Sequence, residues 1–225
     1  MVAIIDPEGQ AQQRPRMLPD ELRDRVRALV LAEERILPVG GSLGAVLPRG
    51  GLPRGAVVAV GGAPGVGAST LVLHLLAAAT SKDEWVGAID PEAVLGGLAA
   101  FEAGIDLTRL AVVRRVPRKE WSRAVAVLLD GLSVVAARVP TGLSTGEARR
   151  LLARARERRS ILLATGAWPI EAALRLQAEG SGWVGLGRGT GLLGERALRV
   201  RVVGRGAAVR ERVGEVALPG RARAS

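Results

Sequence analysis

The stretch AVVAVGGAPGVGASTLVLHLLAAAT, residues 56–80, decides the fold. Its first residues form an apolar run after Gly55, which predicts a buried parallel strand. Its last residues, STLVLHLLAAAT, place Leu71, Leu75 and Ala78 on one face of a helix. A strand, a glycine-rich turn and a helix in this order are the setting that a phosphate-binding loop requires.

The turn departs from the phosphate-binding pattern G-x-x-x-x-G-K-[ST] at one position. Gly62, Gly67 and Ser69 keep the required spacing, but Ala68 stands in the place of the lysine. In a working loop the backbone N–H groups hold the phosphates, the lysine reaches the outer phosphate oxygens and the hydroxyl holds magnesium. The sequence therefore keeps the backbone cradle without its charge. The residues of this degenerate loop are Gly62, Gly65, Gly67, Ala68, Ser69 and Thr70.

Beyond the loop, apolar strands alternate with amphipathic helices. The predicted strands are 85–90, 110–115, 132–139 and 161–168, and the predicted helices are 91–104, 119–131 and 144–160. The last helix begins at Ser144 with Glu147 at the capping-box position. This alternation predicts an α/β fold with a mostly parallel β-sheet flanked by helices. As an alternative, AVAVLLD (124–130) could itself be a strand that ends on Asp130.

The two ends of the chain follow other patterns. Residues 174–187 and 196–206, joined by a glycine-rich segment, predict a C-terminal antiparallel β-hairpin. Residues 19–38 predict an N-terminal helical arm, which we expect to contact a partner or a second copy of the chain through Leu22, Val26, Leu29 and Val30. We therefore divide the chain into a flexible start with this helix (1–37), a core domain (38–206) and a basic C-terminal tail (207–225).

The amino-acid composition indicates which kinds of partner the protein binds. Hydrophobic residues make up 48% of the 225 residues, enough for a core, and the net charge of +10 comes almost entirely from arginine. Such a charge favours nucleic acid or an acidic protein as a partner. Arg150, Arg154 and Arg158 form a stripe that favours a solvated helix face over a phosphate contact. The expected nucleic-acid contacts are Arg188, Arg196, Arg199, Arg201 and Arg205.

The sequence lacks the residues and segments that metal sites, secretion signals and membrane spans require. The chain has no cysteine and one histidine, His74, in an apolar helix, so we expect no metal site and no cofactor. The N-terminus does not follow the signal-peptide pattern, and no apolar run approaches the roughly 20 residues of a membrane span. We therefore expect a cytoplasmic protein.

Several stretches of the sequence resemble those of a known protein family. GGLPRG (50–55), the loop GAPGVGAST (62–70), AIDPE (88–92) and the hairpin region (182–206) resemble the RecA-type recombinase fold. Within that superfamily the chain resembles ImuA-type proteins of the bacterial translesion-synthesis mutasome. The likeness covers about 38–206, and the hairpin is what favours the ImuA type.

The resemblance assigns three site positions. Glu92 falls where recombinases have their water-activating glutamate, whereas Ala68 and Ala136 fall where they have the lysine and the magnesium aspartate. Asp130 would supply that aspartate only if 124–130 were a strand. We therefore expect a pseudo-ATPase without catalytic residues, in which Glu92 is a helix-start carboxylate stabilised by the helix dipole.

The resemblance also implies a role. It predicts a non-catalytic adaptor in DNA-damage-induced mutagenesis that bridges an ImuB-like Y-family polymerase homologue and an error-prone C-family DNA polymerase, with weak DNA binding. Two alternatives stay open. The first is a DNA-stimulated ATPase in which another basic residue replaces the lysine, and the second is a cell-division inhibitor of the SulA type.

Overall fold

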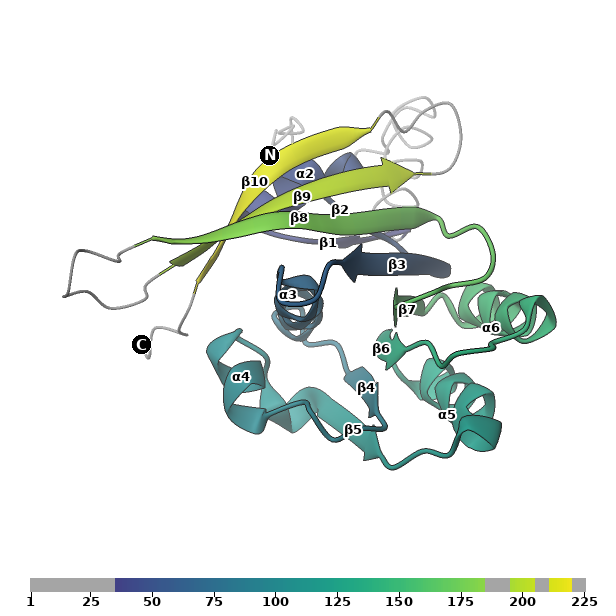
Figure 1. The fold of residues 1–225 in the computed structure, drawn as a ribbon. Coiled ribbons are helices and arrows are strands. Elements are labelled where there is room, and N and C mark those ends of the chain that lie inside the picture. Colours follow the sequence, from purple (N-terminus) through teal and green to yellow (C-terminus); the bar gives the residue numbers. More distant parts are fainter. Residues whose placement is uncertain (1–34, 185–194, 205–210, 220–225) are drawn as a thin grey trace, which may run out of the picture. The chain divides into compact units, whose positions relative to one another are not determined.

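The computed structural model describes residues 35–184, 195–204 and 211–219. Contacts divide the chain between Glu34 and Arg35. The predicted N-terminal helix lies outside the described residues, as do its apolar positions Leu22, Val26, Leu29 and Val30. Within the described part, a mostly parallel sheet carries helices on both faces and continues into antiparallel strands, which confirms the predicted fold class (Figure 1).

The central sheet has the strand order β10-β9-β8-β3-β7-β6-β4-β5. Strands β3 to β8 pair in parallel, and β8, β9 and β10 pair antiparallel. Strand β3 lies inside the sheet, where Val58 pairs with Leu163 on one side and with Leu174 on the other. The strands are β3 (Ala56–Gly62), β4 (Val86–Asp90), β5 (Leu110–Arg114), β6 (Val134–Arg138), β7 (Ile161–Thr165), β8 (Leu174–Val184), β9 (Glu195–Gly204) and β10 (Arg212–Pro219).

Helices cover the two faces of the parallel strands. Helices α3 (Ala68–Thr80) and α4 (Gly97–Glu102) lie on one side, and α5 (Arg118–Gly131) and α6 (Thr145–Arg158) lie on the other (Figure 1). Leu71 and Leu75 of α3 are fully buried against the sheet, as the helical spacing predicts. On the opposite face Trp121 and Leu151 are buried in a second apolar cluster. At about 2 kcal/mol for each buried side chain of this kind, these contacts fix both helix layers on the sheet.

The segment 124–130 is helical, because it belongs to α5 with Val125 and Leu129 buried. The alternative strand that would end on Asp130 is therefore wrong. Helix α6 has the predicted capping box, in which the Ser144 hydroxyl accepts the N–H of Glu147 and the Glu147 carboxylate accepts the N–H of Ser144.

The predicted hairpin is confirmed as β8 and β9. Leu198, Val200 and Val202 are fully buried, while Arg199 and Arg201 lie on the other face of β9. A third antiparallel strand, β10, lies in the region that we had assigned to a basic tail, and it pairs with β9 from Arg212 to Pro219. Its buried residue Val216 completes the apolar layer that β8 and β9 begin.

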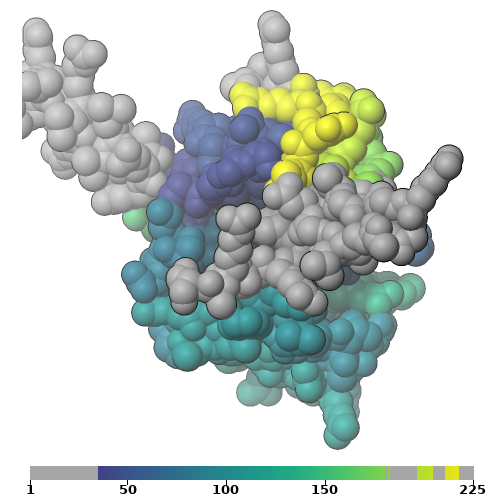
Figure 2. All heavy atoms as spheres, turned by 90° about the vertical axis from the view of Figure 1, so that its left-hand side faces the viewer, coloured from purple at the N-terminus to yellow at the C-terminus, as the bar shows by residue number. Residues whose placement is uncertain are grey.

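The glycine- and proline-rich segment before β3 is also ordered into elements. It forms β1 (Ile36–Pro38), α2 (Gly41–Val46), a 3-10 turn (Pro48–Gly50) and β2 (Gly51–Pro53). Figure 2 shows β10 in yellow directly beside this blue and purple region. The backbone N–H of Ala217 in β10 donates to the Ser42 hydroxyl, which donates in turn to the Ala217 carbonyl. Helix α2 therefore covers the outer edge of β10.

Helix α4 is shorter than predicted. The expected helix 91–104 forms only from Gly97 to Glu102, with a second short turn at Leu107–Arg109. The cause is Asp90, whose carboxylate accepts the N–H groups of Val94 (3.0 Å) and Leu95 (2.9 Å) and so holds 91–96 in an irregular turn. No helix among the described residues combines the length and apolar character needed to cross a bilayer.

Candidate functional site

The glycine-rich loop joins the end of β3 to the start of α3 at the carboxyl edge of the parallel strands. Gly65 (φ 79°) and Gly67 (φ 117°) have left-handed backbones, which glycine adopts without strain. A Cβ on Gly62 would lie 2.9 Å from the carbonyl oxygen of Ala178 in β8. The glycine at position 62 therefore serves the close packing of the loop against β8. Ala68, the first residue of α3, packs its methyl group against the apolar core.

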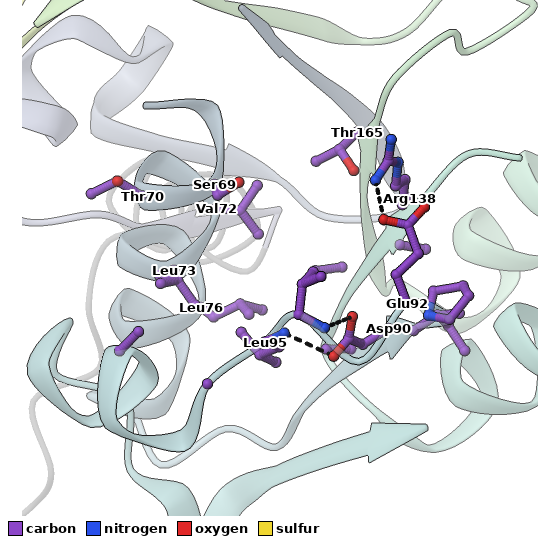
Figure 3. A pocket seen from close by; sticks show the side chains of 18 residues that line it. Ser69, Thr70, Val72, Leu73, Leu76, Asp90, Glu92, Leu95, Arg138 and Thr165 are labelled. Atoms are coloured by element: carbon purple, nitrogen blue, oxygen red, sulfur yellow. Dashed lines mark hydrogen bonds and ion pairs between the residues drawn. The ribbon is translucent and has the colours of Figure 1, made fainter. Parts of the chain in front are cut away.

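A cavity of about 470 Å³ opens beside the start of α3. Val72, Leu73 and Leu76 of α3 form one wall, and the turn after β4 forms the other (Figure 3). Ser69, Thr165 and Arg138 supply polar groups at the end nearest the loop. The cavity lies where ligands bind in open parallel sheets, outside the carboxyl ends of the strands.

Glu92 and Arg138 face each other at this cavity. The Arg138 guanidinium donates to the Glu92 carboxylate at 2.6 Å, and both side chains are exposed (Figure 3). The expectation that Glu92 is a helix-start carboxylate is wrong, because α4 begins only at Gly97. Its carboxylate is held by an arginine from β6 instead of by a helix dipole.

The other carboxylate at this edge, Asp90, has a structural role. Its side chain is buried and accepts the two backbone N–H groups described above, and Arg114 lies 3.8 Å away. The Asp90 carboxylate therefore holds in place the turn that forms one wall of the cavity.

The position at which the resemblance places a magnesium aspartate is apolar in the structure. Ala136 is buried in β6, where it pairs with Ala88 of β4 and Leu163 of β7. The residues present therefore do not fit a magnesium nucleotide: methyl groups occupy both the lysine position and the aspartate position.

Asp130 does not replace that aspartate. It lies at the end of α5, on the opposite face of the sheet, in ion pairs with Arg154 (2.5 Å) and Arg158 (3.2 Å) of α6. The hydrogen bond from Arg154 lowers the pKa of the Asp130 carboxyl. The arginine stripe of α6 is thus partly an intramolecular contact between α5 and α6, which the sequence pattern did not indicate.

Two arginines of β9, Arg199 and Arg201, are also paired with carboxylates. Arg201 contacts both Glu179 and Glu211, and Arg199 lies 3.8 Å from Glu179. Arg188 and Arg205 lie outside the described residues, as does the side chain of Arg196. Nucleic-acid contact by these five arginines stays a prediction.

His74 is half-buried on α3, and burial lowers its pKa. In the ranges that the structure describes, no three or more histidine, cysteine, aspartate or glutamate residues gather as they would around a metal ion.

Sequence reasoning missed Arg138 and Thr165 as site residues. Each ends a parallel strand at the edge that carries the loop, and this position was the signal that could have identified them. Their approach to Glu92 and Ser69 depends on sheet order, which the sequence pattern does not specify.

The fold and the loop define the class: an α/β protein whose inner strand leads through a degenerate phosphate-binding loop into a helix. The chain belongs to the family of the MT3502 N-terminal domain, whose family model matches residues 45–170. It is 32% identical over 153 residues to Rv3395c of Mycobacterium tuberculosis (strain H37Rv), a match that covers 66% of this chain and 72% of that protein.

Part of the chain is also similar to a recombinase. The chain is 40% identical over 74 residues to protein RecA of Chelativorans sp. (strain BNC1). This match covers 32% of the chain and 21% of RecA, so it supports a RecA relationship over a limited part of both proteins.

Proposed function

We propose that this protein is a non-catalytic RecA-like adaptor of the ImuA type in DNA-damage-induced mutagenesis. It bridges an ImuB-like Y-family polymerase homologue and an error-prone C-family DNA polymerase during translesion synthesis. The RecA similarity and the sequence resemblance to ImuA-type proteins support this assignment.

The non-catalytic role is supported by the side chains found in the loop and in the strands beside it. The two positions that would carry charge in a recombinase are Ala68, packed on the core, and Ala136, buried in β6. The Glu92 carboxylate, at the position of the water-activating group, is occupied by Arg138. Arg138, the one cation among the described residues that line the cavity, is paired with Glu92, so no free cation is left to stabilise the charge that develops in phosphoryl transfer.

The proposed assembly uses surfaces on and around the core domain. The predicted helix that carries Leu22, Val26, Leu29 and Val30 binds a polymerase subunit or a second copy, and the arginines of the hairpin region contribute weak, sequence-independent DNA binding. Without a nucleotide to switch the contact, we favour a small fixed assembly over a dynamic filament.

A genetic experiment tests the proposal. Deletion of the gene should abolish mutagenesis induced by ultraviolet light while leaving spontaneous mutation unchanged, and the wild-type chain should restore it. Glu92→Gln should restore it equally, since no hydrolysis is needed, whereas Leu22→Asp with Val26→Asp should not. Normal induced mutagenesis in the deletion strain would rule out the adaptor role.

One observation favours the ATPase alternative. Arg138 places a guanidinium at the cavity that Ser69 also lines, and in this alternative it takes the place of the missing lysine. ATP hydrolysis by the wild-type protein that is stimulated by DNA and lost on Arg138→Ala would support this function over the adaptor.

A further inference from the structure

The two helix layers of the sheet differ in charge. Helix α3 has no charged side chain within its bounds, and α4 has Glu102 as its only one. Helices α5 and α6, which form the layer on the opposite face (Figure 1), are rich in cations. These are Arg118, Lys119, Arg123, Arg149, Arg150, Arg154, Arg156 and Arg158. The positive charge of the helix layers therefore lies on the α5 and α6 side of the sheet.

Part of this charge is neutralised within the layer. The ion pairs between the two helices and within α6 are Arg118–Glu147, Arg154–Asp130, Arg158–Asp130 and Arg154–Glu157. The remaining carboxylate, Glu120, follows Lys119 and offsets its charge. Every carboxylate of α5 and α6 is thus bound or offset. The cations left over are Arg123, Arg149, Arg150 and Arg156, which are exposed and have no ion pair in the described part of the chain.

Two of these unpaired arginines lie along the contact between α5 and α6. Arg150 precedes Arg154 by about one helical turn, so it shares the side of α6 that binds Asp130 of α5. Arg123 precedes Asp130 by about two turns and shares the side of α5 that faces α6. Both residues are exposed, so they form a row at the outer rim of this contact.

A second row lies on the other side of α6. Arg149 and Arg156 share this side because they are two turns, or about 10 Å, apart along the helix. The side faces β3, since an added Cβ on Gly55 would lie 3.3 Å from the Cα of Arg156. Arg175 of β8 continues the row on the same face of the sheet, because it pairs with Ala59, whose side chain is buried in the apolar cluster of α6. Arg175 is exposed and has no ion pair among the residues described.

Small residues separate the two rows. Ala153 is exposed and lies about one turn from both Arg149 and Arg150, and Gly146 is exposed near the start of α6. A ligand that contacts both rows therefore meets no bulky side chain at these two positions. We call Arg123, Arg149, Arg150, Arg156 and Arg175 the α6 arginine surface.

The chemistry of this surface fits one class of partner. Of the large apolar side chains that the structure shows exposed, Val127 is the one that lies on α5 or α6, whereas a protein interface needs a buried apolar or aromatic centre. The aromatic side chains of this face, Trp121 and Trp168, are buried and give no platform for the unpaired bases of a single strand. Exposed arginines without apolar or aromatic neighbours fit the phosphates of a duplex.

From this arrangement we propose that the α6 arginine surface binds the phosphate backbone of double-stranded DNA without sequence preference. A helix with its side chains is about 10–12 Å across, close to the roughly 12 Å width of the major groove of B-DNA. The two rows thus contact the phosphates that border the groove, and Ala153 and Gly146 have no polar side chain to recognise base edges.

This surface differs from the arginines of the hairpin in one respect. Arg199 and Arg201 already contact Glu179, so a phosphate competes with a carboxylate there. A phosphate at the α6 arginine surface displaces no carboxylate of the described residues. The inference extends the DNA binding of the proposed function to a second surface and does not depend on contacts with polymerase subunits.

A labelled duplex tests the surface with the full-length purified chain. The duplex has about 20 base pairs, or roughly two turns of B-DNA, and binding is followed by fluorescence anisotropy at several salt concentrations. The logarithm of the association constant should fall linearly with the logarithm of the salt concentration, by roughly 0.9 for each phosphate contact. A second duplex of unrelated sequence should bind equally, and a single strand of the same length more weakly.

Variants locate the contact. Arg149→Ala with Arg156→Ala should weaken duplex binding by at least roughly tenfold at low salt and reduce the salt slope by about 2. Ala153→Glu keeps a good helix former and should weaken binding similarly, because it adds a carboxylate between the two rows. The matched control is Arg49→Ala with Lys82→Ala, which removes the same charge at exposed positions outside α5 and α6 and should bind like wild type. Circular dichroism of each variant verifies the fold.

Several results would overturn the proposal. They are no duplex binding at low salt, an unchanged salt slope in the Arg149 and Arg156 variant, an equal loss in the control variant, and tighter binding of the single strand. Displacement of the duplex by polyglutamate at an equal concentration of charge would assign the surface to an acidic protein instead. Loss of binding in this variant together with normal induced mutagenesis in the deletion strain would refute the adaptor role and leave the DNA surface established.

Discussion

Restoring the charges of the loop region is the sharpest test of the non-catalytic site. We predict that the wild-type protein hydrolyses no ATP and that Ala68→Lys alone creates no activity, because Ala136 still supplies no carboxylate. The double variant Ala68→Lys with Ala136→Asp should gain nucleotide affinity over wild type, since it returns both charged groups to the edge where β3 and β6 end.

The magnitude follows from the two missing contacts. A hydrogen bond to a charged group contributes about 1.5–3 kcal/mol, so two of them amount to about 3–6 kcal/mol, or roughly two to four decades in Kd. Recovery should fall short of this range because the Glu92 carboxylate is bound to Arg138. The Ala136→Asp change also has a structural cost: it places a carboxylate between Ala88 and Leu163, which should lower stability by about 1–3 kcal/mol.

The assay is isothermal calorimetry with ATP and magnesium, together with a coupled hydrolysis assay. Circular dichroism of each variant separates failure to bind from failure to fold. Magnesium-dependent hydrolysis by the wild-type protein that disappears on Glu92→Gln would refute the reasoning, because it would show that the site works without the lysine.

Three further predictions concern stability and DNA. Ser144→Ala should lower the free energy of unfolding in urea by about 1 kcal/mol, the usual value of an N-cap, and an unchanged midpoint would exclude the capping box as a stabilising element. Hydrogen bonds from Arg118, and then from Ser144 and Ser122, hold the pKa of Glu147 well below its usual range. Its contribution is therefore complete above the unfolded pKa of about 4.3 and is lost progressively as the pH falls from there toward the lowered folded pKa, so wild type should lose stability steadily below about pH 5 and Glu147→Gln should lose less. Arg199→Glu with Arg201→Glu should weaken DNA binding at low salt and flatten its salt dependence, and an unaltered filter-binding curve would exclude the hairpin as a DNA contact.

Periodicity predicted the parallel core because its elements carry local signals. The strands β3, β4, β6 and β7 are continuous apolar runs, and α6 begins at a capping box that is complete within four residues. Each of these signals lies inside the element that it specifies. The antiparallel pairing of β8 and β9 was predictable for the same reason, since Leu198, Val200 and Val202 alternate with arginine.

The elements that were missed depend on distant contacts. In β10 the inward positions include Gly214, where an added Cβ would lie 2.6 Å from a methyl group of Val46, so the strand lacks a clear apolar alternation. Helix α2 lies in a glycine-rich segment and is held by contacts such as that between Ser42 and Ala217. Residues 91–96 are not helical because the Asp90 carboxylate binds the backbone N–H groups of Val94 and Leu95. The helical periodicity of the sequence gives no sign of these hydrogen bonds.

Some residues of the candidate site were predictable from the sequence, but Arg138, Thr165 and the geometry of the site were not. The loop, Glu92 and Ala136 could all be identified from the sequence. The ion pair of Glu92 with Arg138 joins two strand ends that lie side by side only because β4 pairs with β6 in the sheet. The apolar cavity results from the same arrangement and from the turn that Asp90 holds.

The inner position of β3 has a consequence for synthesis of the chain. Its partners β7 and β8 follow it by about a hundred residues, and the last paired residue of β8 on β3 is Ala178. At roughly 5–20 residues per second, translation leaves the apolar run of β3 without at least one of its two neighbours for roughly 6–23 s. Unpaired apolar strands associate with other chains during such intervals. The strand that leads into the glycine-rich loop therefore stays open to such association until the chain has been made as far as β8.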